Sequence, residues 1–212
     1  MIKEIFLSIL VAVISYLIGS VSTGILLSKN TGTDIRSEGS RNPGATNMLR
    51  VMGTKMGVLT FIGDSLKAII ACLLGQWVLP NNTFGIEGFG TMLAGIFAVL
   101  GHNWPIFYDF RGGKGVASSV AVRLMLNPTY GLFCLGIFLL IIYFTEYISL
   151  GSLCLISCFV LLCLLEREKN LWMIICSLLL FALSLYRHRA NISRLLHGTE
   201  NKMTFFRKRG KQ

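Results

Sequence analysis

The sequence has 212 residues, of which 53% are hydrophobic and 14% are charged, and its mean hydropathy is +0.66. A water-soluble domain carries about a quarter charged residues, so this composition excludes a soluble globule and predicts an all-α integral membrane protein. The net charge of +10 does not indicate nucleic-acid binding, because the basic residues lie between and after long apolar runs.

Seven apolar segments are expected to form membrane helices within one polytopic domain that covers residues 1–212. The fourth segment is too short to cross a hydrocarbon core of about 30 Å at about 1.5 Å per residue. A five-span arrangement, in which some middle segments merge or stay partial, is therefore the alternative. The segments are residues 6–27, 57–79, 89–104, 116–126, 130–145, 148–165 and 171–185.

Basic residues are concentrated in alternate loops, which predicts how the chain is oriented in the membrane. The loop after the first segment, the loop before the fourth and the C-terminal tail carry most of them, whereas Lys3, Arg167 and Lys169 lie on the opposite side. Because positively charged loops stay in the cytoplasm, we expect these loops and the C-terminus there and the N-terminus outside. Residues 187–212 then form a basic cytoplasmic tail that continues from the last span.

The first of these loops contains the sequence DIRSEGSRNPGATNMLR, residues 34–50, which has the features of an anion-binding site. Its glycines and proline permit a tight backbone path that turns N–H groups towards a ligand. Its neutral polar side chains supply hydrogen bonds, and its arginines suit bidentate contact with phosphate. The alternative is a basic, solvated loop that only fixes orientation. The candidate binding residues are Arg36, Ser40, Arg41, Asn42, Thr46, Asn47 and Arg50, and Gly39, Pro43 and Gly44 shape the backbone.

A second motif, GHNWPIFYDFRGGKGV at residues 101–116, places three glycines around a lysine just before an apolar helix. Consecutive glycines before a helix N-terminus can form a phosphate or oxyanion nest, and the lysine adds a point charge. This is not a Walker A loop, which needs another glycine and a following Ser or Thr. The alternative is a flexible hinge, with the histidine in a structural role. The candidates are His102, Gly112, Gly113, Lys114 and Gly115.

A third motif, YRHRANISRLLHGTENK at residues 186–202, closes the last span. His188 and Asn191 are three residues apart, so on a helix they share a face and can point together into a site. The arginines are weaker candidates, because a basic cluster at a membrane end usually meets lipid headgroups. The alternative for the whole segment is an amphipathic tail.

Two further features concern residues inside the apolar segments. Asp64 and Lys67 stand three apart in the second segment, and ionisable residues in lipid are a functional hypothesis by default, with a structural ion pair as the alternative. The six cysteines all fall in apolar segments without metal-site spacing. We therefore expect no metal and no other cofactor.

Taken together, the three motifs resemble, in the same order, the cytoplasmic motifs of the bacterial acyl-phosphate-dependent glycerol-3-phosphate acyltransferases, the PlsY family. The resemblance rests on GSRNPGATNMLR, GHNWP...FRGGKGVA and RHRANISRLLHGTENK, and with the apolar segments it covers nearly the whole chain. The family usually has glycine where Arg41 and Ala68 stand, and often an acidic residue where Ala190 stands.

The resemblance implies an enzyme of the bacterial cytoplasmic membrane that catalyses the first step of phospholipid synthesis. A fatty acyl group would pass from acyl phosphate to the sn-1 hydroxyl of glycerol 3-phosphate, giving 1-acyl-glycerol 3-phosphate and phosphate. Its partners would be these substrates and the lipid bilayer, without nucleic acid, and it would act as a monomer. The catalytic residues would be Ser40, Arg50, Lys114, His188 and Asn191. The substrate-binding residues would be Asn42, Gly44, Thr46, Asn47, Lys67, His102, Gly112, Gly113, Gly115 and Glu200.

An absent motif supports an acyl phosphate donor. Acyltransferases that use coenzyme A or carrier-protein donors commonly carry His-x-x-x-x-Asp, but the residues five after the three histidines are Phe107, Ser193 and Lys202. The alternative functions are a transporter for a phosphorylated solute and a non-catalytic lipid-binding scaffold. The sequence shows no inverted repeat of the kind that transporters have.

Overall fold

The structure is a computed structural model that describes residues 1–166 and 170–203. These residues form α-helices joined by loops and two short 3-10 turns, and they contain no strand, which confirms the all-α class. Some of the basic residues on which the predicted orientation rests lie outside the described residues: Arg167, Lys169, Arg207, Lys208, Arg209 and Lys211. The helices are α1 (Ile2–Ser20), α2 (Thr23–Lys29), α3 (Ala45–Met52), α4 (Thr54–Val78), α5 (Phe89–Asn103), α6 (Val116–Leu126), α7 (Pro128–Thr145), α8 (Ile148–Leu165) and α9 (Leu171–Leu196).

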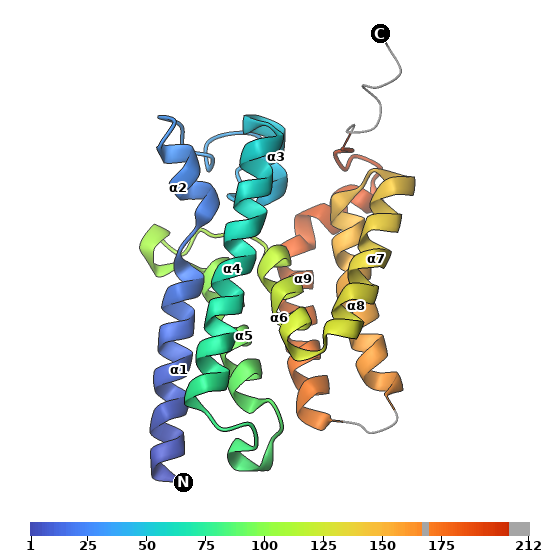
Figure 1. Ribbon diagram of the computed structural model, residues 1–212. Coiled ribbons are helices and arrows are strands. Elements are labelled where there is room, and N and C mark those ends of the chain that lie inside the picture. The colour runs from blue at the N-terminus through green and yellow to red at the C-terminus, as the bar shows by residue number, and fades with distance from the viewer. Residues whose placement is uncertain (167–169, 204–212) are drawn as a thin grey trace.

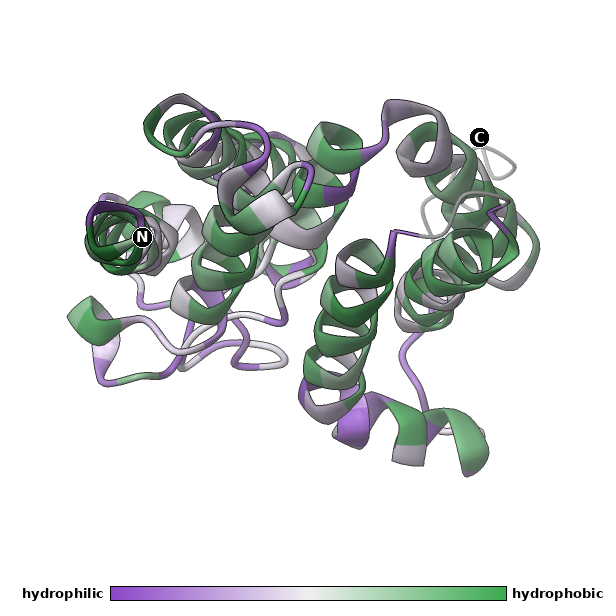
Figure 2. Cartoon of the chain, turned by 90° about the horizontal axis from the view of Figure 1, so that it is seen from below, coloured by the Kyte–Doolittle hydropathy of each residue, from purple (hydrophilic) through white to green (hydrophobic). Residues whose placement is uncertain are grey.

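The helices form two groups that α6 and α9 connect. Helices α1, α4 and α5 pack together on one side, and α7 and α8 pair on the other (Figure 1). Helix α6 contacts α4, α5 and α7, while α9 contacts α5 and α8. The helices are largely hydrophobic, and hydrophilic residues gather in the connecting loops (Figure 2). Large apolar side chains such as Trp77 and Phe144 are 85% and 77% exposed, as expected for helices that face lipid.

Five helical stretches are long and apolar enough to cross a membrane, which is the number in the five-span alternative. The other two predicted segments also form helices, but α5 has 15 residues and α6 has 11. Their lengths of about 23 Å and about 17 Å fall short of a hydrocarbon core of about 30 Å. The five stretches are Ile2–Lys29, Thr54–Val78, Pro128–Thr145, Ile148–Leu165 and Leu171–Leu196.

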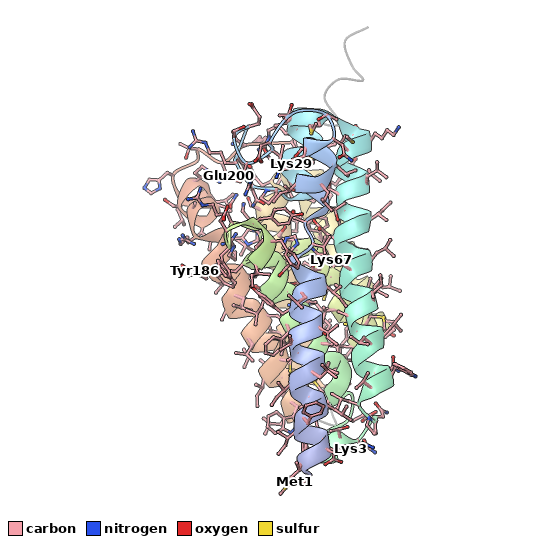
Figure 3. The ribbon with its side chains drawn as sticks, turned by 90° about the vertical axis from the view of Figure 1, so that its left-hand side faces the viewer. Met1, Lys3, Lys29, Lys67, Tyr186 and Glu200 are labelled. Atoms are coloured by element: carbon pink, nitrogen blue, oxygen red, sulfur yellow. The ribbon has the colours of Figure 1, made fainter. Side chains whose placement is uncertain are left out.

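The segments that carry the motifs lie towards one end of the molecule. Lys29 and Glu200 lie near this end, opposite to Met1 and Lys3 (Figure 3). Helix α3 forms within the first motif, and α9 runs to Leu196 instead of ending near residue 185. The extension follows from the arginine, alanine and leucine residues of this stretch, which favour helix. The third motif is therefore mostly helical, and its side chains have fixed directions.

The first span is interrupted where α1 ends, because Val21 and Ser22 have extended backbone. A break of this kind leaves carbonyl groups without helical partners, which is costly in lipid. Lys67 Nζ donates a hydrogen bond to the Val21 carbonyl oxygen at 2.6 Å and pairs with Asp64 Oδ1 at 3.0 Å. Lys67 is a predicted substrate-binding residue. The structure places its ammonium group at this break, where it donates a hydrogen bond to a carbonyl oxygen that has no partner within the helix.

Candidate active site

The three motifs converge on one cavity of about 140 Å³, which we name the central cavity. Its wall combines the first motif, the loop before α6, the C-terminal half of α9 and the segment after it with side chains of α4, α7 and α8. The five predicted catalytic residues line it: Ser40, Arg50, Lys114, His188 and Asn191. Seven of the predicted substrate-binding residues line it as well: Asn42, Gly44, Thr46, Asn47, His102, Gly115 and Glu200.

Two helix N-termini contribute to the wall of the central cavity. Helix α3 begins after Gly44, and α6 begins after Gly115, whose φ of 77° is a conformation that suits glycine. Residues at both starts line the cavity. Unpaired N–H groups and the helix dipole favour negative charge at such positions. The cavity is therefore built to hold anions.

A chain of polar side chains links the cations of the cavity. Lys114 Nζ donates to Asn191 Oδ1, and Asn191 Nδ2 donates to Glu200 Oε1 at 2.7 Å. The second carboxylate oxygen of Glu200 accepts from Arg194 Nε at 2.7 Å, and Ser149 Oγ donates to Oε1 at 3.0 Å. Glu200 is thus engaged by protein groups and fixes the positions of the residues around it. The side chain of Arg50 makes no hydrogen bond or ion pair within the described part of the chain, so its donors are available to a ligand.

The ionisation of Glu200 and Lys114 follows from burial and from this network. Burial raises the pKa of the Glu200 carboxyl, but hydrogen bonds from Asn191, Arg194 and Ser149 outweigh that effect and hold the pKa below its usual range. Burial lowers the pKa of the Lys114 ammonium from 10.5 to about 8, Glu200 opposes this shift, and Arg194 adds to it. At neutral pH the cavity therefore presents an ionised Glu200 and a protonated Lys114.

His188 is buried, and one of its ring nitrogens is used within its own helix. Its Nδ1 lies 2.9 Å from the Ser184 carbonyl oxygen. A carbonyl oxygen only accepts hydrogen bonds, so Nδ1 carries a proton and, in the neutral ring, Nε2 has a free lone pair. Because His188 lines the central cavity, this nitrogen is available to accept a hydrogen bond from a hydroxyl group of a ligand.

Two glycines of the second motif do not form the predicted nest. The Gly113 N–H donates to the His102 carbonyl oxygen at 3.1 Å, and Arg187 donates to the carbonyl oxygens of Gly112 and Gly113. A Cβ on Gly113 would collide with the His102 ring, and one on Gly112 would collide with the His102 carbonyl. Neither glycine lines the central cavity. Both allow close packing of the loop, and the part of this motif that lines the cavity is Lys114, Gly115 and the α6 N-terminus.

The asparagines of the first motif hold the loop in shape. Asn47 Oδ1 accepts from the Ser40 N–H at 2.9 Å, and its Nδ2 donates to the Glu38 carbonyl oxygen at 3.0 Å. Asn42 Oδ1 accepts from the Gly44 N–H at 2.9 Å. These two side chains line the cavity, but the amide oxygen and nitrogen of Asn47 and the amide oxygen of Asn42 already have protein partners. They position Ser40 and the start of α3, and Thr46 and Arg50 remain freer to meet a ligand.

The sequence makes Arg194 only a weaker candidate, and it does not point to Ser149 or Ser152. Arg194 follows Asn191 by three residues, and Asn191 follows Arg187 by four, so the three share a helix face, a signal that the sequence contains. Ser149 and Ser152 of α8 also line the cavity, and two serines three residues apart in an apolar helix are a weaker signal. Within residues 1–166 and 170–203 no group of three His, Cys, Asp or Glu residues could hold a metal ion.

The pKa of Lys114 generates a prediction about pH. We expect kcat/KM for acyl transfer to fall as pH rises through about 8, because the ammonium that attracts the anionic substrate then loses its proton. Lys114→Ala should remove this decline and lower kcat/KM by about 30- to 1000-fold, since a charge-assisted contact in a water-poor site contributes about 2–4 kcal/mol. Lys114→Arg should also lower kcat/KM, because the planar guanidinium group of arginine replaces the compact ammonium group of lysine.

The measurement is a pH–rate profile of the purified protein and both variants, with spontaneous hydrolysis of the donor subtracted. Lys114→Arg is the matched control, because its charge persists to higher pH and its residual rate should show no decline near pH 8. The same decline in Lys114→Ala, or a flat wild-type profile through this range, would contradict the assignment.

Comparison with known proteins agrees with this geometry. A family model described as Glycerol-3-phosphate acyltransferase matches residues 9–198. A protein of Clostridioides difficile strain 630, named glycerol-3-phosphate acyltransferase, is 44% identical over 205 residues, which cover 94% of this chain and 97% of that protein.

Two solved structures of PlsY, an integral membrane glycerol 3-phosphate acyltransferase, have a similar fold. The glycerol 3-phosphate form has a TM-score of 0.86 and 34% identity, and the match covers 96% of this chain and 99% of that chain. The lysophosphatidic acid form has a TM-score of 0.82 and 35% identity, with 92% and 95% covered. The family model matches most of the chain, and these relatives match it almost from end to end. The chain therefore belongs to the glycerol-3-phosphate acyltransferase family.

Proposed function

We propose that this protein transfers a fatty acyl group from acyl phosphate to the sn-1 hydroxyl of glycerol 3-phosphate. The products are 1-acyl-glycerol 3-phosphate and orthophosphate. The observation that carries the proposal is that the five predicted catalytic residues, from three distant motifs, line one cavity with two helix N-termini. The family match favours this activity over a phosphate-solute transporter.

In this proposal the acceptor lies on the side of Arg50 and His188. The free donors of Arg50 bind the phosphate of glycerol 3-phosphate, and Asn191 lies next to it. The Nε2 lone pair of His188 accepts a hydrogen bond from a hydroxyl of the acceptor. Ser40, fixed by Asn47, positions the reacting groups. Charge-assisted hydrogen bonds of about 1.5–3 kcal/mol each suffice to hold a dianion when several act together.

The acyl phosphate lies against Lys114 and the N-terminus of α6. The acceptor hydroxyl attacks the acyl carbonyl carbon, the bond between that carbon and the phosphate oxygen breaks, and orthophosphate leaves. The hydroxyl proton passes to a phosphate oxygen. Because the donor is a mixed anhydride and already activated, orientation and stabilisation of the developing oxyanion are the main tasks of the protein.

The acyl chain of the donor meets an apolar side of the cavity. Phe61 of α4, Phe138 of α7 and Ile148 of α8 are apolar residues of the cavity lining. These helices belong to the stretches long enough to cross the membrane, so the chain passes from the cavity towards lipid. Burial of each CH₂ group contributes about 0.8 kcal/mol. A fatty acyl donor therefore binds better than a short one.

The absence of His-x-x-x-x-Asp predicts which donor the enzyme accepts. We expect steady release of orthophosphate with acyl phosphate and glycerol 3-phosphate, and little or no release of thiol with the acyl-CoA of the same chain. Both rates are measured on one preparation of purified protein. Comparable rates with the two donors would contradict the proposal.

We also propose that the end carrying the motifs faces the cytoplasm of a bacterial inner membrane. The lysines and arginines of the first-motif loop, the second-motif loop and the end of α9 lie at this end, which supports the orientation through the positive-inside rule.

Single cysteines test the orientation. A membrane-impermeant thiol reagent added to intact cells should not label cysteines introduced at Ser37, Tyr108 or Thr199. The matched control is Asn82→Cys, an exposed position in the loop between α4 and α5 at the opposite end, which should label readily. Ready labelling at the first three positions with protection of position 82 would reverse the orientation.

A further inference from the structure

A second cavity, of about 590 Å³, adjoins the loop that carries Lys114. We name it the arginine pocket, because four arginines and two aspartates line it: Arg36, Arg41, Arg111, Arg187, Asp34 and Asp109. No residue lines both this pocket and the central cavity. The pocket is therefore lined by a different set of residues from the site described above.

The three motifs form the wall between the two cavities. Ser40 lines the central cavity and its neighbour Arg41 the arginine pocket. His188 lines the central cavity and its neighbour Arg187 the arginine pocket. In the same way, Lys114 lines the central cavity and the nearby Gly112 the arginine pocket. Neighbouring residues of each motif thus line different cavities. A ligand in the arginine pocket would be separated from the Lys114 side chain by the loop that carries this lysine.

The charges of the arginine pocket favour an anion. Asp34 is fully engaged by Arg36, whose Nε and Nη2 bind both carboxylate oxygens at 2.8–3.1 Å. These hydrogen bonds lower the pKa of Asp34 to about 2, so that this pair stays ionised and is internally neutral. Among the lining residues, Asp109 then remains to balance the charges of Arg41, Arg111 and Arg187. The pocket keeps an excess of two positive charges.

Donors in the pocket remain available to a ligand. The side chains of Arg41 and Arg111 are exposed, and within the described part of the chain they make no hydrogen bond or ion pair. Arg187 uses Nε and Nη2 on the Gly112 and Gly113 carbonyl oxygens, which leaves Nη1 free. Guanidinium groups match the oxygens of a phosphate group in geometry as well as in charge.

The backbone at the pocket is strained at three of its lining residues. Arg41, Asp109 and Phe110 have φ values of 58°, 53° and 57°, in the left-handed region that favours glycine. A bulky side chain in this conformation persists only where the surroundings hold it. At residue 41 an arginine lines the pocket although glycine would fit this backbone better.

We propose that the arginine pocket is a second phosphate-binding site, and that its ligand is a phosphate group with about two negative charges. Orthophosphate released by the reaction and the phosphate monoester headgroup of phosphatidic acid at this membrane end both have this chemistry. The identification with released orthophosphate rests on the proposed function, whereas binding of a phosphate group does not. Arg187 contacts both the pocket and the loop of Lys114, so that occupancy of the pocket acts on the position of that loop.

Calorimetric titration with orthophosphate tests the site in the full-length protein in neutral detergent. Arg50→Ala/Lys114→Ala removes two cations of the central cavity, and this protein should still bind orthophosphate. Adding Arg41→Gly and Arg111→Ala should weaken that binding by about tenfold or more, which is about 1.4 kcal/mol. Glycine at position 41 suits the backbone, so thermal unfolding should show no loss of stability from that change.

Arg189→Ala is the matched control, because Arg189 lies on α9 over the Tyr186 ring and lines neither cavity. It should leave orthophosphate affinity unchanged. The site is disproved if Arg50→Ala/Lys114→Ala abolishes all binding, or if binding is insensitive to Arg41→Gly/Arg111→Ala. A failure of the proposed function would look different: no acyl transfer, with arginine-dependent phosphate binding retained.

Vesicles distinguish the two sources of the phosphate group. The protein with Arg50→Ala/Lys114→Ala is placed in phosphatidylcholine vesicles with or without phosphatidic acid, and orthophosphate binding is measured again. Displacement of orthophosphate by phosphatidic acid, dependent on Arg41 and Arg111, assigns the pocket to a lipid headgroup. Binding that phosphatidic acid does not affect assigns it to free orthophosphate.

Discussion

The contact on which the rest of the site depends is the guanidinium of Arg187 on the loop before α6. It donates hydrogen bonds to the carbonyl oxygens of Gly112 at 2.7 Å and Gly113 at 2.9 and 2.6 Å, and it lies 5.3 Å from the centre of the Trp104 ring. The Gly113 N–H is held by the His102 carbonyl oxygen at the same time. The loop is thus fixed at both its carbonyl and its amide groups, and Lys114 is directed into the central cavity.

Fixing the loop in this way prepares an anion site before any ligand arrives. Lys114, Arg50 and Arg194 line a cavity in which Glu200 partly balances their charge. Concentrating cations where water is scarce is unfavourable in the empty protein and becomes favourable when anionic substrates enter. Two helix N-termini add fixed dipoles, so that little reorganisation is needed as charge develops on the reacting carbonyl. The same network, through Asn191 and Glu200, ties this loop to the end of α9.

The sequence predicts the location of the site better than the role of each residue. Glycines, arginines and neutral polar side chains cluster in three loops on one side, and helical spacing correctly places His188 beside Asn191 on one face. The role of Arg187 depends on carbonyl groups more than 70 residues away, which no local pattern encodes. Lys67 donates a hydrogen bond at a helix break that contains neither glycine nor proline, so no local residue type marks the break. Gly113 allows close packing of the loop, whereas the motif suggested an anion nest, and either role requires glycine.

Steady-state acyl transfer by Arg187→Gln beside Arg189→Gln tests whether Arg187 positions Lys114 for the reaction. Both variants remove one arginine from α9, but only Arg187 holds the loop. Displacement of a reacting group by about 1 Å can cost about 100-fold in rate. We expect a loss of this order in kcat for a folded Arg187→Gln protein and near-normal kcat for Arg189→Gln. Equal turnover by the two variants would contradict this expectation.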